Sequence, residues 1–247
     1  MQDLTLNGGL ERGFYHCEII GGKEAQPHSR PYMAYLYIQH GDKYKYCGGF
    51  LVAENFVLTA AHCQGDRITV YLGAHNIRQQ EPSRQEIPVR RQIPHRQYNR
   101  ETLNNDIMLL QLSHNATLTR EVELLRLPTG HCRVCPETLC NVAGWGMTSL
   151  TTTTNTLREV NLSVVADDLC KKEYHNYFPS TMLCVGDSDN SLYRKSTYRG
   201  DSGGPLVCDG VAEGIVSKGK RNSAKSHVVF TRISHFVPWI KANMQQI

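Results

Sequence analysis

GDSGGP, residues 200–205, is the most informative motif in this sequence. A serine among glycines is a candidate nucleophile, because glycine lets the backbone turn tightly and lets a substrate approach closely. The same turn can direct backbone N–H groups at a developing oxyanion. A serine hydroxyl is a weak nucleophile by itself and needs a general base, which in turn needs an acid to orient it. The stretch therefore predicts a base and an acid elsewhere in the chain.

Two other strings supply these partners. TAAHC (59–63) offers His62 as the base, directly after an apolar run. NDIMLL (105–110) offers Asp106 as the acid, at the start of a strongly apolar run. A carboxylate there is costly to bury alone, and an imidazole N–H would satisfy it. The three strings together predict a catalytic triad of His62, Asp106 and Ser202.

Short runs rich in apolar and β-branched residues recur along the chain, separated by turn signals. They are Tyr32–Gln39, Phe56–Thr59, Ile68–Leu72, Ile107–Leu112, Asn141–Ala143, Leu157–Val165, Met182–Val185, Pro205–Cys208, Val211–Ser217 and His227–Ile233. Their spacing favours an all-β sandwich or barrel over βαβ units. Only the end is helical in pattern, with an apolar stripe from Ser234 and Pro238 in the first turn.

Composition narrows the class of protein. The chain has 247 residues, 40% hydrophobic and 20% charged, as ordinary globular proteins do. No run approaches about 18 consecutive apolar residues, so no membrane-spanning helix is expected. The formal net charge of +4 is too small to indicate nucleic-acid binding.

Nine cysteines indicate disulfides and an oxidising compartment. Secretion is therefore expected, although residues 1–18, MQDLTLNGGLERGFYHCE, lack the basic start and apolar core of a signal peptide.

Several further strings complete a recognisable pattern. They are IIGG (19–22), CGGF (47–50), AGWG (143–146) and GIVS (214–217). With the triad strings, they make the sequence resemble the chymotrypsin-like serine proteases from Ile19 to the C-terminus. PHSRPYMAYL (27–36), LGAHNI (72–77) and FTRI (230–233) are similar to the granule proteases of mast cells and cytotoxic lymphocytes, chymase and granzymes of the B and H type.

This resemblance implies the fold and the domain organisation. Residues 1–18 would be a propeptide or atypical N-terminal segment, and 19–247 the protease domain. Two six-stranded antiparallel β-barrels, at about 30–125 and about 126–233, would hold the active site in the cleft between them, followed by a C-terminal helix at about 234–246.

The resemblance also implies a mechanism that needs no cofactor. Ser202 would attack the scissile carbonyl, and the N–H groups of Gly200 and Ser202 would form the oxyanion hole. An activating protease would cut between Glu18 and Ile19, and the freed amine of Ile19 would pair with Asp201. The 247-residue form would then be an inactive zymogen.

Substrate preference is inferred from the same likeness. Ser196 stands where trypsin-like relatives have an aspartate, so cleavage after Arg or Lys is not expected. Thr197 is small and Gly219 leaves the pocket entrance open, which suits Phe, Tyr or Leu. Val228 on the pocket wall argues against acidic substrates and would narrow the pocket toward Leu, Met or Val. An elastase-like or Met/Leu-preferring granzyme-type protease is the alternative.

Ser217 and Gly219 would lie along the substrate backbone. Arg199 would border the leaving-group side of the cleft.

The family pattern pairs six cysteines as Cys47–Cys63, Cys140–Cys208 and Cys170–Cys184. Of the other three, Cys17 would tether the propeptide, or Cys132 and Cys135 would pair with each other, or one of them with Cys17. A zinc site of His131, Cys132, Cys135 and Cys140 suits the metal by ligand type. However, Cys140 already has a partner in the family pattern, so no metal is expected.

Protein or peptide substrates, an activating protease and serpin-type inhibitors are the expected partners. A heparin-like glycosaminoglycan in a secretory granule is a further one, with candidate ligands Arg84, Arg90, Arg91, Arg96 and Arg100.

Two other classes of protein stay open. A non-catalytic binding protein could use the same scaffold with an intact triad. An esterase of the α/β-hydrolase fold would need the histidine last in chain order, whereas here it comes first.

Overall fold

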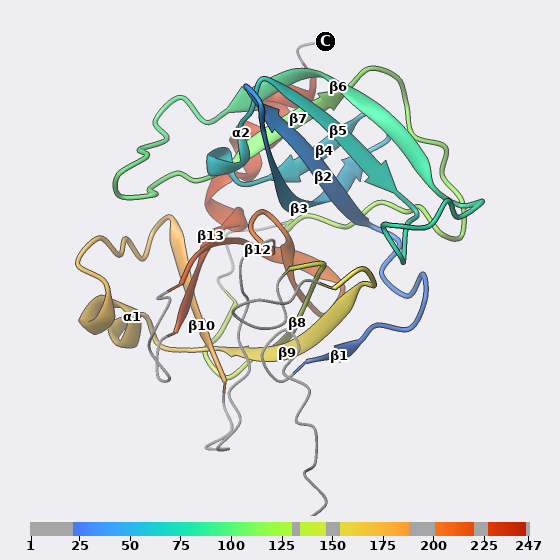
Figure 1. The fold of residues 1–247 in the computed structure, drawn as a ribbon. Helices are drawn as coiled ribbons and strands as arrows, with labels where there is room; N and C mark the ends of the chain where they lie inside the picture. The colour runs from blue at the N-terminus through green and yellow to red at the C-terminus, as the bar shows by residue number, and fades with distance from the viewer. Residues whose placement is uncertain (1–21, 130–133, 147–153, 188–200, 220–226, 246–247) are drawn as a thin grey trace, which may run out of the picture.

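The computed structural model describes residues 22–129, 134–146, 154–187, 201–219 and 227–245. Two β-barrels lie one above the other, and the C-terminal helix follows the second barrel and packs against the first (Figure 1). The predicted all-β fold of two six-stranded antiparallel barrels with a C-terminal helix is confirmed.

The first barrel is a closed antiparallel sheet in the order β2-β3-β4-β7-β6-β5. Its strands are β2 (Met33–His40), β3 (Lys43–Ala53), β4 (Phe56–Thr59), β5 (Arg67–Leu72), β6 (Gln85–Pro94) and β7 (Met108–Leu112). Alternation along β2 explains the packing, because Leu36 and Ile38 enter the barrel core while Tyr35 and Tyr37 face outward. Each large apolar side chain buried in this way contributes about 1.5–3 kcal/mol.

The second barrel closes through the pairing of β8 with β9. Its strands are β8 (Leu139–Gly144), β9 (Arg158–Val164), β10 (Met182–Gly186), β11 (Pro205–Cys208), β12 (Val211–Lys218) and β13 (Val228–Arg232). The short β1 (Lys23–Glu24) adds to the outer edge of β9. The barrels meet at Trp145. Its ring lies edge-on to that of Tyr35, with 5.7 Å between the ring centres, and its indole N–H donates to the His75 carbonyl at 3.0 Å.

The structure has one α-helix that the sequence pattern did not predict. Helix α2 (Ile233–Gln245) begins one residue before the expected position, but α1 (Asp167–Glu173) shows that the chain is helical elsewhere too. Seven residues are too few for a clear apolar period. Acidic residues in its first turn and lysines in its last complement the helix dipole. Strands β3 and β6 were also missed, the latter because prolines and charged residues interrupt its pattern.

Three disulfides join elements around the site. Cys47–Cys63 ties β3 to the 3₁₀ turn η1 (Ala61–Cys63), Cys140–Cys208 ties β8 to β11, and Cys170–Cys184 ties α1 to β10. Because Cys140 is in a disulfide, it has no thiolate for the zinc site considered above. Cys135 is exposed, and Cys17, His131 and Cys132 lie outside the described residues. In the described ranges, neither helix is long and apolar enough to cross a membrane.

Candidate active site

His62 and Asp106 form a doubly bonded pair in the first barrel. His62 lies on η1, and its Nδ1 is 2.7 Å from Asp106 Oδ2. The His62 backbone N–H donates to the other carboxylate oxygen at 2.9 Å. The Asp106 side chain is fully buried, whereas the His62 side chain is 25% exposed. Since a carboxylate can only accept, Nδ1 donates to Asp106, which leaves Nε2 as the nitrogen able to act as a base.

Two residues of the second barrel also hold Asp106. The Ser217 hydroxyl donates to Asp106 Oδ2 at 2.6 Å, and the Thr231 hydroxyl donates to the Asp106 backbone carbonyl at 2.7 Å. Sequence reasoning assigned Ser217 to the substrate backbone and missed its contact with the carboxylate. No local pattern reveals that contact, because the two residues are 111 positions apart in the chain.

Tyr98 lies beside this pair. Its hydroxyl is buried and bonds to none of the described residues. Burial and the negative charge of Asp106 raise the pKa of Tyr98 to about 12, so it stays neutral.

The turn that carries Ser202 packs against the first barrel. The Ser202 carbonyl accepts a hydrogen bond from Gly48 N–H at 2.7 Å, and Gly203 N–H donates to the Val216 carbonyl at 2.9 Å. Gly203 has φ +83°, and a Cβ there would lie 2.1 Å from Thr59 Oγ1. Only glycine fits this position.

Ser202 itself is partly exposed, and within the described chain its hydroxyl makes no hydrogen bond. Hydrogen bonds between catalytic groups are often long without substrate and shorten only when substrate is bound.

Asp201, next to the serine, is fully buried against the AGWG segment. Its Oδ1 accepts from Gly146 N–H at 2.9 Å. A Cβ on Gly144 or Gly146 would come within 2.2 or 2.4 Å of that oxygen, so both glycines are needed to admit the carboxylate. Its expected partner Ile19 lies outside the described residues, as does Glu18.

Gly219 and Val228 face each other across the ends of β12 and β13. A Cβ on Gly219 would be 4.0 Å from Val228 Cγ2, and Val228 is buried in the apolar core of the second barrel. Four other residues singled out from the sequence lie outside the described part of the chain. They are Ser196, Thr197, Arg199 and Gly200.

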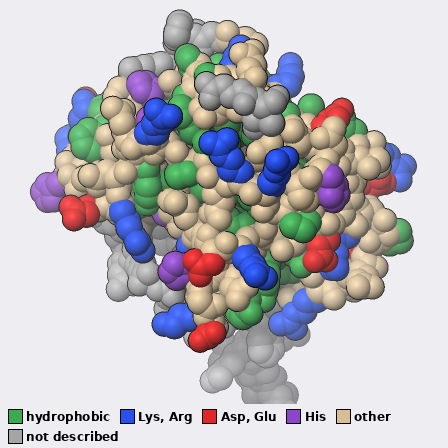
Figure 2. Space-filling model, turned by 90° about the horizontal axis from the view of Figure 1, so that it is seen from above, with side chains coloured by type: hydrophobic (Ala, Val, Ile, Leu, Met, Phe, Trp, Pro, Cys, Tyr) green, Lys and Arg blue, Asp and Glu red, His purple; other side chains and the backbone are tan. Residues whose placement is uncertain are grey.

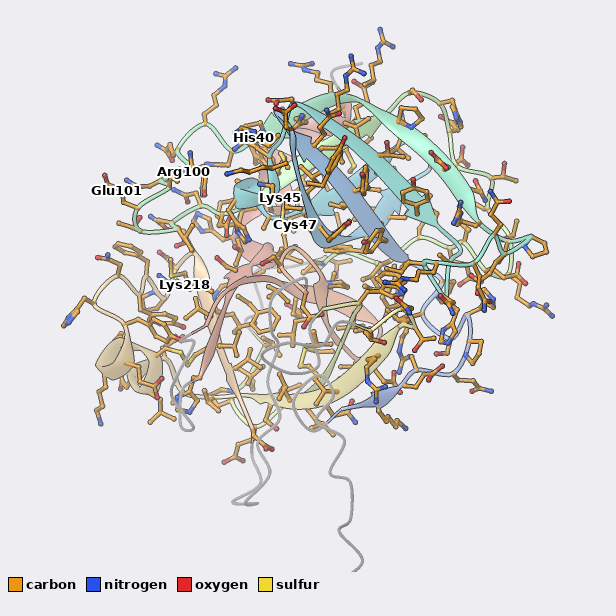
Figure 3. All side chains as sticks on the ribbon, in the orientation of Figure 1. His40, Lys45, Cys47, Arg100, Glu101 and Lys218 are labelled. Atoms are coloured by element: carbon orange, nitrogen blue, oxygen red, sulfur yellow. A yellow bond between two sulfur atoms is a disulfide. The ribbon has the colours of Figure 1, made fainter. Side chains whose placement is uncertain are left out.

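A basic cavity of about 580 Å³ opens beside His62, a feature that sequence reasoning missed. Lys45 on β3 enters it and donates to the His62 carbonyl at 3.1 Å. Burial and the charge of Arg100 lower the pKa of Lys45. Figure 3 shows Lys45 and Arg100 on the same side of the first barrel. His40 and Lys43 also line the cavity, with Asp66 as its carboxylate.

The five arginines considered for polyanion binding do not behave alike. Arg84 is held by Glu86 at 3.9 Å and lies 5.1 Å from the centre of the Tyr71 ring. Arg90 and Arg91 are exposed on β6 and line a hollow of about 450 Å³ together with Arg67, which sequence reasoning missed. Arg96 and Arg100 are exposed on the loop after β6. Figure 2 shows lysine and arginine side chains spread over the top of the first barrel, with carboxylates between them.

Comparisons with known proteins agree with this geometry. The family model for trypsin matches residues 19–240. The chain is 52% identical over 231 residues to human granzyme B, covering 93% of this chain and 92% of that protein. It is 53% identical over 242 residues to human cathepsin G, covering 98% and 92%. The solved structure of GrC matches with a TM-score of 0.87 at 47% identity, covering 92% of this chain and 99% of that one.

The fold, the buried His–Asp pair and these matches define a trypsin-fold serine protease. The chain belongs to the trypsin family and is a serine endopeptidase by class. Within the family it is related to granzymes, cathepsin G and the sheep mast cell protease 3, the last at 51% identity.

Proposed function

We propose that the chain hydrolyses peptide bonds with a triad of Ser202, His62 and Asp106. The observation that carries this proposal is the double hydrogen bond between His62 and Asp106, which fixes the tautomer and orientation of the imidazole. The Ser202 turn is bonded to the same barrel through Gly48, which supports its place beside the imidazole.

In this mechanism Ser202 Oγ attacks the scissile carbonyl while His62 Nε2 takes its proton. The same proton then goes to the leaving amine, and water repeats the sequence to release the acyl group. The N–H groups of Gly200 and Ser202 would stabilise the oxyanion, and loss of one such donor typically reduces kcat by about 10²–10³-fold.

Activation would follow a cut between Glu18 and Ile19 by another protease. The new amine of Ile19 would pair with Asp201, whose carboxylate is fully buried beside the serine. A buried carboxylate is best tolerated when a cation pairs with it, so the amine would order the oxyanion turn.

Cleavage would occur after large apolar residues, Phe, Tyr or Leu, as in chymase. The apolar wall formed by Val228 opposite Gly219 supports this preference and offers no charge to a basic or acidic side chain. The proposal gives roles to further residues. Ser196 and Thr197 would line the pocket, and Arg199 would border the leaving-group side. Ser217 and Gly219 would lie along the substrate backbone. If Val228 narrows the pocket, the preference would shift to Leu, Met or Val.

The protein would be stored in a secretory granule and secreted, as its relatives among the granzymes and mast cell proteases suggest. A heparin-like chain would bind the exposed arginines of β6, and serpin-type inhibitors would trap the active form.

The test is a peptide-library profile of protein trimmed to begin at Ile19, beside the full chain and a Ser202→Ala variant. Cleavage after Phe, Tyr or Leu, absent from both controls, is the expected result. Cleavage after Val or Ala would leave the mechanism intact and make the specificity wrong. No cleavage by folded, trimmed protein would favour a non-catalytic binding protein on this scaffold.

A further inference from the structure

Lys218 ends β12, directly after Ser217, and its ammonium joins three segments of the chain. Nζ donates to the Thr102 carbonyl at 2.9 Å and to the Asn176 carbonyl at 2.8 Å. It also lies 5.7 Å from the centre of the Tyr174 ring. Thr102 belongs to the loop that leads to Asp106, and Tyr174 and Asn176 follow α1. The lysine therefore lies where loops of both barrels meet (Figure 3).

No carboxylate of the described chain forms a salt bridge with the Lys218 ammonium. It has three N–H donors, and its two hydrogen-bond acceptors in the described chain are neutral carbonyls. Asp106, whose charge acts on Lys218, is already bonded to His62 at 2.7 Å. Burial lowers the pKa of Lys218, because the charged form is partly desolvated there, whereas the charge of Asp106 acts the other way. An anion brought to the third donor would be stabilised.

The contacts of Ser217 and Lys218 show which part of a substrate would meet this cation. The pairing of β12 with β13 is irregular between Val216 and Lys218, so the direction of each side chain is taken from its partners. The Ser217 hydroxyl reaches Asp106, whereas the Lys218 ammonium reaches the carbonyls of Thr102 and Asn176. In the proposed function, the substrate backbone lies along Ser217 and Gly219. We place it antiparallel to this segment, as the strands beside β12 are, with its residue before the cleaved bond next to Ser217. The second residue before the bond then stands opposite Lys218, and the fourth shares the same face.

We propose that Lys218 is a specificity-determining residue that selects a carboxylate side chain at the second or fourth substrate position before the cleaved bond. This inference rests on the proposed peptidase function. The part of the cleft that binds substrate residues before the cleaved bond would thus prefer Asp or Glu. This preference is separate from that of the apolar pocket beside Val228.

The test uses trimmed enzyme and matched peptides that carry Glu or Gln at the second, third or fourth position before one fixed apolar cleavage residue. The ratio of kcat/KM for Glu over Gln is expected to be about fivefold at the second or fourth position and about one at the third. This ratio should fall as salt is raised, because Lys218 is partly exposed to solvent. Lys218→Met keeps the length of the side chain without its charge and should bring every ratio to about one.

Two further variants separate charge from folding. Lys218→Arg keeps the charge and should retain the preference even if loss of the carbonyl contacts lowers activity overall. Lys172→Met removes an exposed lysine of α1 and should change nothing. The proposal is overturned if wild-type enzyme cleaves the Gln and Glu peptides equally, or if the preference survives in Lys218→Met. Failure of wild-type enzyme to cleave any peptide would instead refute the proposed function.

Discussion

The Ser217 hydroxyl donates to the same Asp106 oxygen that His62 Nδ1 contacts, at 2.6 and 2.7 Å. The carboxylate of the first barrel is thus oriented by a residue of the second. With the His62 backbone N–H, three donors converge on a fully buried carboxylate. The orientation of Asp106 therefore depends on contacts from both barrels.

Removing the Ser217 hydroxyl should impair catalysis without unfolding the protein. A hydrogen bond to a charged group contributes about 1.5–3 kcal/mol, and Asp106 keeps its two bonds to His62 in the variant. We expect Ser217→Ala to lower kcat about tenfold, measured on trimmed enzyme with the best library peptide. An unchanged kcat, with the melting temperature also unchanged, would show that the hydroxyl does not orient the carboxylate.

Gly146→Ala should disable the enzyme through Asp201. The added Cβ would lie 2.4 Å from Asp201 Oδ1, and the fully buried carboxylate has no room to retreat. Displacing it would disturb the neighbouring oxyanion turn, so kcat/KM should fall about 10²-fold or more. Gly41→Ala is the control, because it sits in open space at a surface turn and should affect stability alone. Wild-type activity in Gly146→Ala would contradict the role given to Asp201.

Acid should weaken the contact between the first barrel and α2 through His95. Its ring lies 5.2 Å from those of Phe236 and Trp239, and burial, helped by His235, lowers the pKa of His95. The unfolded chain therefore binds this proton more readily, and stability falls as pH drops below the ordinary value of 6.5.

Urea unfolding at pH 5.5 and 7.5 measures this effect. In a Ser202→Ala background, which prevents self-digestion, His95→Phe should lose part of the acid-induced destabilisation. His114→Gln, at an exposed position, should retain all of it. Equal pH dependence in the parent and His95→Phe would refute the prediction.

The exposed arginines of β6 should carry affinity for a polyanion. The double change Arg90→Gln and Arg91→Gln should make the protein elute from a heparin column at lower salt, because both side chains are solvent-facing and line one hollow with Arg67. Arg84→Gln is the matched control, since Arg84 is occupied by Glu86 and Tyr71 and should elute nearly unchanged. If Arg84→Gln eluted at lower salt than the double variant, the binding surface would lie elsewhere.

Local strings were sufficient for the main outline of the fold and the His–Asp pair. A tight glycine turn, a histidine after an apolar strand and an aspartate before another are patterns that need no knowledge of distant contacts. They led to the all-β fold and to the pair that the structure joins, His62 with Asp106. The role of Ser202 as nucleophile stays a prediction. Helix α1 was missed because it is held by Cys184 and its end charges more than by an apolar period.

The class of chemistry and most of the strands could be predicted from the chain alone, because both depend on residues close together in the sequence; β3 and β6 were the exceptions among the barrel strands. The second-barrel residues that reach Asp106, and the position of the Lys218 ammonium, follow from the three-dimensional fold alone. Those contacts span 111 and 116 positions and exist because two barrels dock face to face. Periodicity reports which face of a strand is buried, but it does not report what that face meets.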